Sequence, residues 1–254
     1  MTRSAGGTPP GPSAQRWPPG TLLHMLDPEA RDALLALGTR RAFAPGEALI
    51  TEGGPEKEVF LLLSGCVKVV RHPAEGRTLL LSIRVRGDVV GEMAALENDE
   101  PRSATVVAAT RVRAQVVGQR PFLALLDARP AMERVVSRAV VAKVRLITRH
   151  RVDVTGAPVL FRLARMLEYL LESHATPCPE GLRIDVPLSQ SELAGLIGAS
   201  APSLHRALRY LRGRGVLSTQ YRQQTVSDRA LLEKIAREAD PDANRVARGR
   251  QQDD

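Results

Sequence analysis

Between Phe43 and Val117 the chain alternates short apolar runs with turn signals, and no other feature limits its fold as strongly. The apolar runs cover residues 48–50, 59–63, 67–70, 79–83, 89–90, 105–108 and 112–117. The turn signals between them are Pro45-Gly46, Gly53-Gly54-Pro55, Gly65, Glu75-Gly76 and Gly87-Asp88. Many short strands at this spacing predict an antiparallel barrel or jelly roll.

From residue 121 the apolar residues repeat with the period of a helix. The pattern predicts a short helix over 121–126 and a longer one from Pro130 to Val152. Apolar positions of the longer helix form two adjacent stripes: Met132, Val136, Val140, Val144 and Ile147, with Val135, Ala139, Ala142 and Leu146 beside them. Two stripes fit a helix that packs on its own domain and also on a partner helix. The alternative is a helix fully buried within a monomer, although basic residues leave one side polar.

Capping residues give the expected limits of the other helices. Asp27 before Pro28 is typical of a helix start, and that helix should end at Gly38. Asp153 is the expected N-cap of a helix over 157–172. Residues 175–181 hold two prolines and a glycine and predict a loop, which is followed by a strand over 182–186.

Two short helices follow, and the second is basic. Ser189-Gln190-Ser191-Glu192 is a capping box, and Ser200 with Pro202 begins the second helix. The exposed side of that helix is expected to present Arg206, Arg209, Arg212 and Arg214. Two such helices joined by a glycine turn predict a helix-turn-helix, and strands over 216–219 and 224–227 with a tip at 221–223 predict a wing.

The composition favours a polyanionic partner and gives no sign of catalysis. The formal net charge is +8, which points first to nucleic acid. The two cysteines, Cys66 and Cys178, form no cluster, and the five histidines are scattered, so we expect no metal site. No apolar run is long enough to span a bilayer, and no secretory signal is visible. Residues 1–20 and 237–254 are expected to be a disordered leader and a disordered tail.

A Gly-Glu pair followed by Arg-Ser-Ala suggests a site for a phosphate and a neighbouring sugar. Arg102 can clamp two phosphate oxygens through its fork of donors, and Ser103 and Ala104 can add a hydroxyl and backbone N–H groups. A phosphate would repel Glu92, whose natural partner is a ribose 2′-hydroxyl. An Arg paired with a nearby Glu across a surface loop is the alternative for Arg102 alone.

These residues resemble the phosphate-binding cassette of the CRP/FNR (cyclic AMP receptor protein) family of bacterial transcription regulators, and the resemblance extends from about Leu23 to Ala236. It implies an α+β fold with an N-terminal cyclic-nucleotide-binding β-roll (jelly roll), a long dimerisation helix and a C-terminal winged helix-turn-helix. The implied limits are 21–127 for the β-roll, 128–153 for the dimerisation helix and hinge, and 154–236 for the DNA-binding domain. The implied ligand site comprises Gly91, Glu92, Met93, Arg102, Ser103 and Ala104.

The resemblance also implies a DNA-binding surface. Its residues are Ser189, Gln190, Ser200, Ser203, His205, Arg206, Arg209 and Arg222. Arg206 falls on the position that reads guanine in the family pattern. Ala201 and Pro202 stand where that pattern has Arg and Glu, so base recognition must differ. His205 could reach a base or a phosphate, or it could be a partly exposed histidine without such a contact.

The base side of the ligand site departs from the family pattern. Ala142 and Lys143 fall where the cyclic AMP receptor protein has the Thr and Ser that meet adenine, and neither supplies that hydroxyl. Cyclic AMP could bind with different base contacts, another cyclic nucleotide could bind, or a ligand could bind without driving the same switch.

We therefore expect a cytoplasmic, homodimeric transcription regulator that is not an enzyme. Its partners would be double-stranded DNA and RNA polymerase, with no membrane contact. It would need no obligatory cofactor, and a cyclic nucleotide (cyclic AMP) would be its effector. A ligand-independent regulator of the same fold is the main alternative, and the regulatory part of an enzyme or channel is another.

Overall fold

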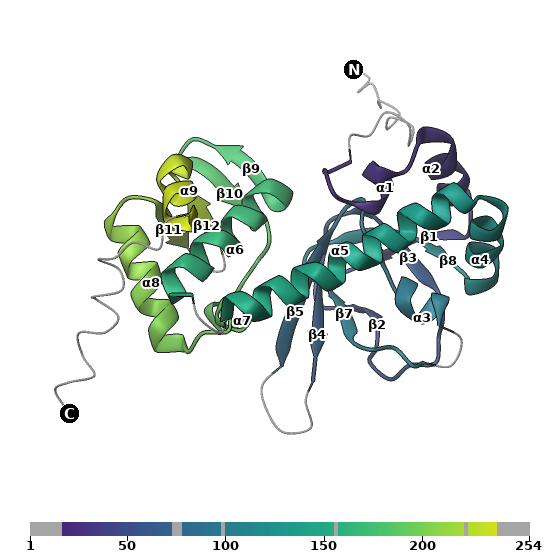
Figure 1. The fold of residues 1–254 in the computed structure, drawn as a ribbon, viewed down its shortest axis with the longest axis horizontal. Coiled ribbons are helices and arrows are strands. Elements are labelled where there is room, and N and C mark those ends of the chain that lie inside the picture. The colour runs from purple at the N-terminus through teal and green to yellow at the C-terminus, as the bar shows by residue number, and fades with distance from the viewer. Residues whose placement is uncertain (1–16, 73–77, 98–99, 155–156, 221–222, 238–254) are drawn as a thin grey trace, which may run out of the picture.

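The computed structural model describes residues 17–72, 78–97, 100–154, 157–220 and 223–237. Figure 1 shows a strand-rich unit and a helix-rich unit, with helix α5 running from the first to the second. The first unit holds α1 (Leu22–Met25), α2 (Pro28–Leu35), β1 (Thr39–Phe43), β2 (Ala48–Ile50), β3 (Val59–Ser64), β4 (Cys66–Arg71), β5 (Leu79–Val85), β6 (Val89–Val90), α3 (Glu92–Leu96), β7 (Thr105–Ala108), β8 (Val112–Val117) and α4 (Gln119–Ala128). After α5 (Pro130–Val154) come α6 (Val159–His174), β9 (Ala175–Cys178), β10 (Gly181–Ile184), α7 (Gln190–Leu196), α8 (Ala201–Gly213), β11 (Leu217–Gln220), β12 (Gln223–Val226) and α9 (Arg229–Arg237).

The β-roll consists of two antiparallel four-stranded sheets, with strand orders β1-β8-β3-β6 and β2-β7-β4-β5. Their facing side chains form one core, which includes Phe43, Leu62, Val106 and Ala114. The predicted jelly roll is therefore confirmed. The first of these sheets also contains β1, which begins at Thr39, before the first predicted strand at residues 48–50.

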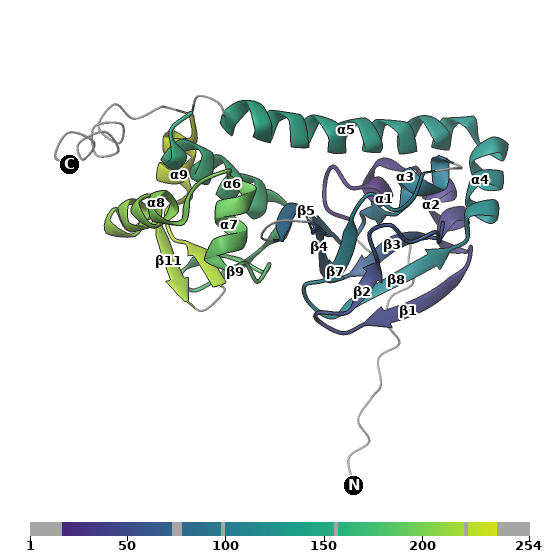
Figure 2. The ribbon, with the colours of Figure 1, turned by 90° about the horizontal axis from the view of Figure 1, so that it is seen from below.

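Strand β3 is buried on both faces. Phe60 and Leu62 belong to the core between the sheets, whereas Val59 and Leu61 belong to a second core under the helices. Successive side chains of a strand point to opposite faces, so a continuous apolar run requires cover on both sides. The outer cover comes from α1, α2, α4 and the first half of α5, and Figure 2 shows α5 lying along the β-roll.

The long helix divides its apolar residues between two environments. Met132, Val136 and Ala139 are buried in the core under the helices. Val141 and Val144 are 48% and 50% exposed. The helix therefore has a buried apolar side and an exposed one, but these sides do not follow the two predicted stripes. Val136 is buried although it shares a stripe with the exposed Val144, and the exposed Val141 belongs to neither stripe.

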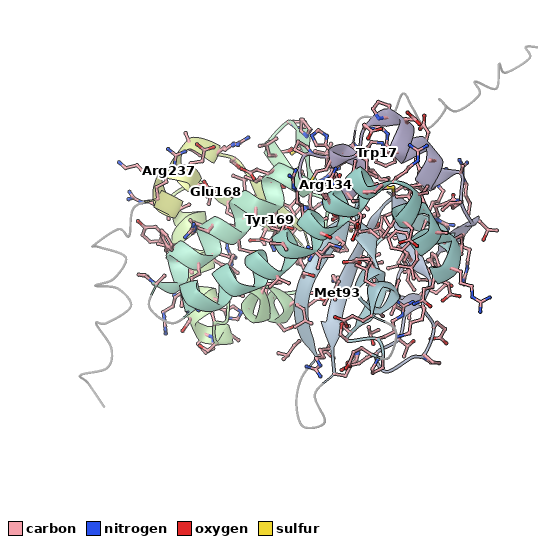
Figure 3. All side chains as sticks on the ribbon, turned by 45° about the vertical axis from the view of Figure 1, so that its right-hand side comes forward. Trp17, Met93, Arg134, Glu168, Tyr169 and Arg237 are labelled. Atoms are coloured by element: carbon pink, nitrogen blue, oxygen red, sulfur yellow. The ribbon has the colours of Figure 1, made fainter. Side chains whose placement is uncertain are left out.

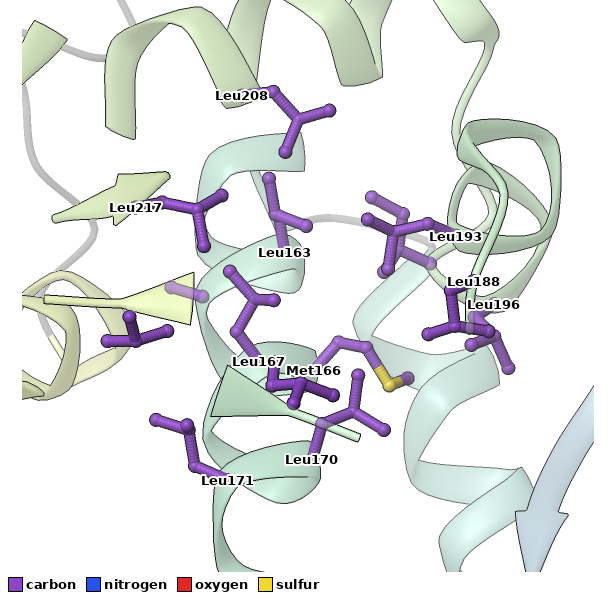
Figure 4. Close-up of a cluster of buried hydrophobic side chains, with 14 of the residues drawn as sticks. Leu163, Met166, Leu167, Leu170, Leu171, Leu188, Leu193, Leu196, Leu208 and Leu217 are labelled. Atoms are coloured by element: carbon purple, nitrogen blue, oxygen red, sulfur yellow. The ribbon is translucent and has the colours of Figure 1, made fainter. Parts of the chain in front are cut away.

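The C-terminal unit packs around α6. Leu163, Leu167 and Leu170 are fully buried and lie against side chains of α7, α8 and the third sheet, whose strand order is β11-β12-β10-β9 (Figure 4). This core continues into the β-roll through Cys66, Leu80 and Ile83. The predicted helix-turn-helix and wing strands are confirmed.

Three local expectations were wrong. Residues Ala175–Cys178 form edge strand β9 instead of a loop. Pro177 has no N–H to donate, and an edge strand tolerates this because one of its sides is not paired. Asp153 lies inside α5, and the N-cap position of α6 is Pro158. Trp17, in the segment expected to be disordered, is only 6% exposed and packs into the helix-covered core. Residues 1–16 and 238–254 of the expected leader and tail lie outside the described residues.

A partly buried ion pair joins the two units. The Lys68 Nζ atom on β4 lies 2.7 Å from Oε1 of Glu192 on α7 and also donates to the carbonyl of Pro187 at 2.6 Å. Glu192 completes the capping box by accepting from the backbone N–H of Ser189 at 2.8 Å. Burial disfavours the ionised carboxyl, but hydrogen bonds from Lys68 and Ser189 outweigh it and lower the pKa of Glu192.

Replacing Lys68 with Met should lower the free energy of unfolding by about 1–3 kcal/mol at neutral pH, because a hydrogen-bonded charge loses its partner. The pKa of Glu192 is lower in the folded state, so the ion pair stabilises the fold above the usual value of 4.5. That contribution is lost as the pH falls through the lowered value. The difference between wild type and Lys68→Met in urea unfolding should therefore shrink under acid conditions.

The matched control is Lys234→Met, because Lys234 is exposed on α9. A Lys68→Met deficit that is the same at neutral and acid pH would contradict the assigned coupling to Glu192.

Candidate functional site

The candidate ligand site is built on Gly91, between β6 and α3. Gly91 has φ +88°, in the left-handed region that favours glycine. A Cβ atom there would lie 2.7 Å from Nη1 of Arg102 and 2.7 Å from the carbonyl oxygen of Glu58. A larger residue would therefore displace the arginine, so the glycine sets how closely Arg102 approaches the start of α3.

The Arg102 guanidinium is buried in this turn, with only 4% of the residue exposed. Nη1 donates to the carbonyl of Gly91 at 2.9 Å, and Nη2 donates to the carbonyl of Glu58 at 2.7 Å. Nε is buried without a hydrogen-bond partner among the described residues. Burial lowers the pKa of Arg102, and the Glu58 carboxylate, 4.0 Å from Nη2, opposes that shift. A buried cation with an unused donor suits an anionic ligand.

The Arg102 backbone is fixed as firmly as its side chain. Its carbonyl accepts from the N–H of Gly53 at 2.8 Å, and its own N–H donates to the carbonyl of Gly54 at 3.2 Å. These two hydrogen bonds tie Arg102 to the predicted turn at Gly53-Gly54 and so fix the position of its backbone while its side chain contacts Gly91.

Glu92 occupies the first turn of α3 and is 3% exposed. Its Oε1 atom lies 2.7 Å from Nζ of Lys143 on α5, and the same amine donates to the carbonyl of Val89 at 2.6 Å. Lys143 thus binds the carboxylate expected to receive a sugar hydroxyl. Ala142, the other position considered for a base contact, is exposed on α5.

The remaining predicted cassette residues surround this centre. Ser103 is exposed beside Arg102, Ala104 is 9% exposed, and Met93 is 43% exposed (Figure 3). The structure therefore brings Gly91, Glu92 and Arg102 into one cluster, with Met93 and Ser103 at its surface.

The basic face of α8 is exposed, as predicted. Arg206 and Arg209 lie on the solvent side, opposite the buried Leu204 and Leu208. Arg206 Nη2 donates to the hydroxyl of Ser203 at 3.0 Å, which orients the guanidinium near the start of the helix.

Polar contacts cap α8 and link it to α7. The Ser200 hydroxyl accepts from the N–H of Ser203 at 3.4 Å, and it also donates to the Ser203 hydroxyl at 3.0 Å. His205 is hydrogen-bonded through Nε2 to Oε1 of Gln190, so these two predicted DNA residues contact each other across α7 and α8. Ser189 caps α7, and Arg222 lies outside the described residues.

The sequence did not predict the two ion pairs that link elements far apart in the chain. Neither Lys68 with Glu192 nor Lys143 with Glu92 was expected, although a lysine within an apolar run is a signal for a buried partner. It also missed a cavity of about 760 Å³ between the units, lined by Trp17, Cys66, Arg86, Glu172, His174 and Asp185. Burial, with Arg84 nearby, lowers the pKa of His174 to about 4.

Comparisons with known proteins match both units. The model of the cyclic nucleotide-binding domain matches residues 40–129, and that of the Crp-like helix-turn-helix domain matches residues 162–235. The chain belongs to the CRP/FNR family. Members of this family are transcription regulators and not enzymes, so the DNA-binding and nucleotide-binding domains define a CRP-like regulator.

Individual relatives of this CRP/FNR chain align over most of their length. The CRP-like cAMP-activated global transcriptional regulator of Mycobacterium tuberculosis is 28% identical over 84% of this chain and 94% of the relative. The cyclic AMP receptor protein of Thermus thermophilus is 27% identical over 85% and 96%. The solved structure of a c-di-GMP-responsive global regulator from Xanthomonas campestris has a TM-score of 0.67 and 21% identity over 80% of this chain and 100% of that one, which shows the fold.

Among the described residues of this CRP/FNR chain, no three His, Cys, Asp or Glu side chains are placed to hold a metal ion. No described helix is both long and apolar enough to cross a membrane.

Replacing Arg206 with Ala should relax the sequence preference at the base that it reads while salt-dependent DNA binding remains, because the phosphate contacts persist. Loss of one good arginine–guanine pair corresponds to roughly 1–3 kcal/mol of discrimination. Competition between specific and random duplexes, followed by fluorescence anisotropy, measures this loss. Lys234→Ala on exposed α9 is the control, and unchanged specificity in Arg206→Ala would contradict the role of Arg206.

Proposed function

We propose that the protein is a homodimeric transcription regulator whose β-roll binds a cyclic nucleotide, with cyclic AMP as the first candidate. The β-roll (21–127) would hold the ligand, α5 and the hinge (128–153) would form the dimer, and the winged helix-turn-helix (154–236) would bind DNA. A cytoplasmic location and contact with RNA polymerase accompany this role. The observation that carries the proposal is the buried cluster of Gly91, Glu92 and Arg102.

The residues of the cluster fit the two ends of a cyclic nucleotide. Arg102 supplies a buried guanidinium for the cyclic phosphate, and Gly91 leaves room where a Cβ atom would meet that guanidinium. Ser103, exposed next to Arg102, can donate its hydroxyl to a phosphate oxygen. Glu92 can accept a sugar hydroxyl. The names of the relatives from Mycobacterium tuberculosis and Thermus thermophilus refer to cyclic AMP, which supports the choice of base.

One observation favours a ligand-independent regulator as the second candidate. Arg102 is already hydrogen-bonded to two backbone carbonyls, and Glu92 is already paired with Lys143. A cluster satisfied by its own chain does not need a ligand to stay folded. A ligand shifts the protein between states only if it binds one state more tightly.

Calorimetric titration with cyclic AMP and with cyclic GMP separates the two candidates. We expect saturable binding, and Arg102→Ala should weaken it roughly a hundred-fold, because charge-assisted hydrogen bonds to the phosphate are lost. Arg111→Ala is the matched control, since Arg111 is an exposed arginine just before β8. Absence of binding to either nucleotide would overturn the nucleotide proposal and favour the second candidate.

The exposed side of α5 supports the homodimer. Val141 and Val144 lie one turn apart on the helix, and each is about half exposed. The exposed Ser137 stands one turn before Val141 on the same side, and its small side chain would let a second helix approach closely. Two exposed valines on a 25-residue helix suit pairing with the same surface of a second copy.

Replacing Val141 and Val144 together with Glu should shift the protein from dimer to monomer, because two charges would enter the apolar interface. Sedimentation velocity measures this shift. The double change Ser218→Glu and Ser227→Glu, at two exposed positions far from α5 in sequence, controls for added charge. A dimer that persists at micromolar concentration would contradict this assignment. Val136 is unsuitable for the test, since it is 1% exposed and packs inside its own subunit.

A further inference from the structure

Lys143 lies at an unusual place for a lysine. Its side chain is only 14% exposed, and it extends from α5 to the junction between β6 and α3. The amine donates to Oε1 of Glu92 at 2.7 Å and to the carbonyl of Val89 at 2.6 Å. Both acceptors flank Gly91, so one side chain ties the long helix to the cassette.

The surroundings show why an amine is placed here. Asp88, at the turn before β6, is partly buried, and burial raises its pKa. The positive charges that oppose this shift belong to Lys143 and to Arg84 on β5, and the negative charge of Glu92 adds to it. Lys143 therefore lies near two carboxyl groups, the buried one of Glu92 and the partly buried one of Asp88. Without it they would repel each other in a medium that screens charge poorly.

The two carboxylate oxygens of Glu92 differ in their hydrogen bonding. Oε1 accepts the ammonium hydrogen, and no described residue donates to Oε2. An ammonium group has donors only, so it binds Oε1 as an acceptor, and a carboxylate accepts hydrogen bonds at both oxygens. Lys143 thus presents Oε2 as an acceptor for a ligand hydroxyl.

We propose that Lys143 is the positioning residue for Glu92: its amine holds the carboxylate so that Oε2 accepts the ribose 2′-hydroxyl of the nucleotide. The inference rests on the proposed function, and it names the residue that makes the site selective for a ribose over a deoxyribose. Lys143 itself need not touch the ligand.

The test compares cyclic AMP with 2′-deoxy cyclic AMP, which lacks the hydroxyl. Dissociation constants are measured by calorimetry for the full chain and for Lys143→Met, Lys143→Gln and Lys143→Arg. Wild type should prefer cyclic AMP by roughly ten-fold or more, the value of one hydrogen bond to a charged group. Met and Gln at position 143 should lose that preference while affinity for the deoxy nucleotide changes less than about two-fold. Arginine should retain the preference.

Lys57→Met is the matched control. Lys57 also donates to backbone carbonyls near α3, those of Glu97 and Glu100, but does not bind Glu92. Its substitution should leave the preference for cyclic AMP unchanged. Circular dichroism melting confirms that each variant is folded.

The outcomes distinguish this inference from the proposed function. If Lys143→Met and Lys143→Gln keep the wild-type preference, or lose affinity for both nucleotides equally, Lys143 does not position Glu92 and the inference is overturned alone. If wild type binds neither nucleotide, the proposed function fails and the inference fails with it.

Discussion

The burial of β3 on both faces is the constraint on which the rest of the structure depends. Its alternating side chains enter two separate cores, so the β-roll is stable only when helices cover its outer face. That requirement brings the first half of α5 against the roll, with Met132, Val136 and Ala139 as its contacts. Once the helix is docked there, Lys143 lies one turn further along and reaches Glu92.

Three basic side chains, the buried Arg102 and the partly buried Lys143 and Lys68, make polar contacts that join separate elements. Arg102 donates through Nη1 and Nη2 to backbone carbonyls, whereas Lys143 and Lys68 each bind a carboxylate and a carbonyl, those of Lys68 on the other unit. Burying an unpaired charge is strongly unfavourable, so each contact fixes the element that supplies the acceptor. Arg102 fixes the Gly91 turn, Lys143 fixes α5 on α3, and Lys68 fixes α7 on β4. The cassette, the long helix and the DNA-reading motif are consequently joined by polar contacts as well as by apolar packing.

The joint between the units is less completely packed than their interiors. The cavity beside His174 lies there, and both ring nitrogens of His174 are buried without a hydrogen-bond partner among the described residues. Unsatisfied buried groups of this kind lower the stability of the contact that encloses them. The joint is thus held by Lys68 and by the apolar residues of β4 and β5.

The sequence by itself determined the local elements and the chemical types of the site. Alternating apolar runs gave the strands, and Ser189, Ser200 and Asp27 gave helix starts that the structure confirms, because caps depend on neighbouring residues only. The cassette residues could be named because their types and spacing from Gly91 to Ala104 resemble the family pattern. Edge strand β9 was missed because its strand character comes from pairing with β10 and not from its own side chains.

Only the tertiary structure decided which distant residues meet. The contact of Lys143 with Glu92 spans 51 positions, and that of Lys68 with Glu192 spans 124. Neither follows from periodicity, because each depends on the angle at which α5 or α7 packs on the roll. The same packing decided which valines of α5 are buried and which stay exposed. A helical pattern fixes the spacing of its stripes, whereas their orientation is set by the surface that the helix covers.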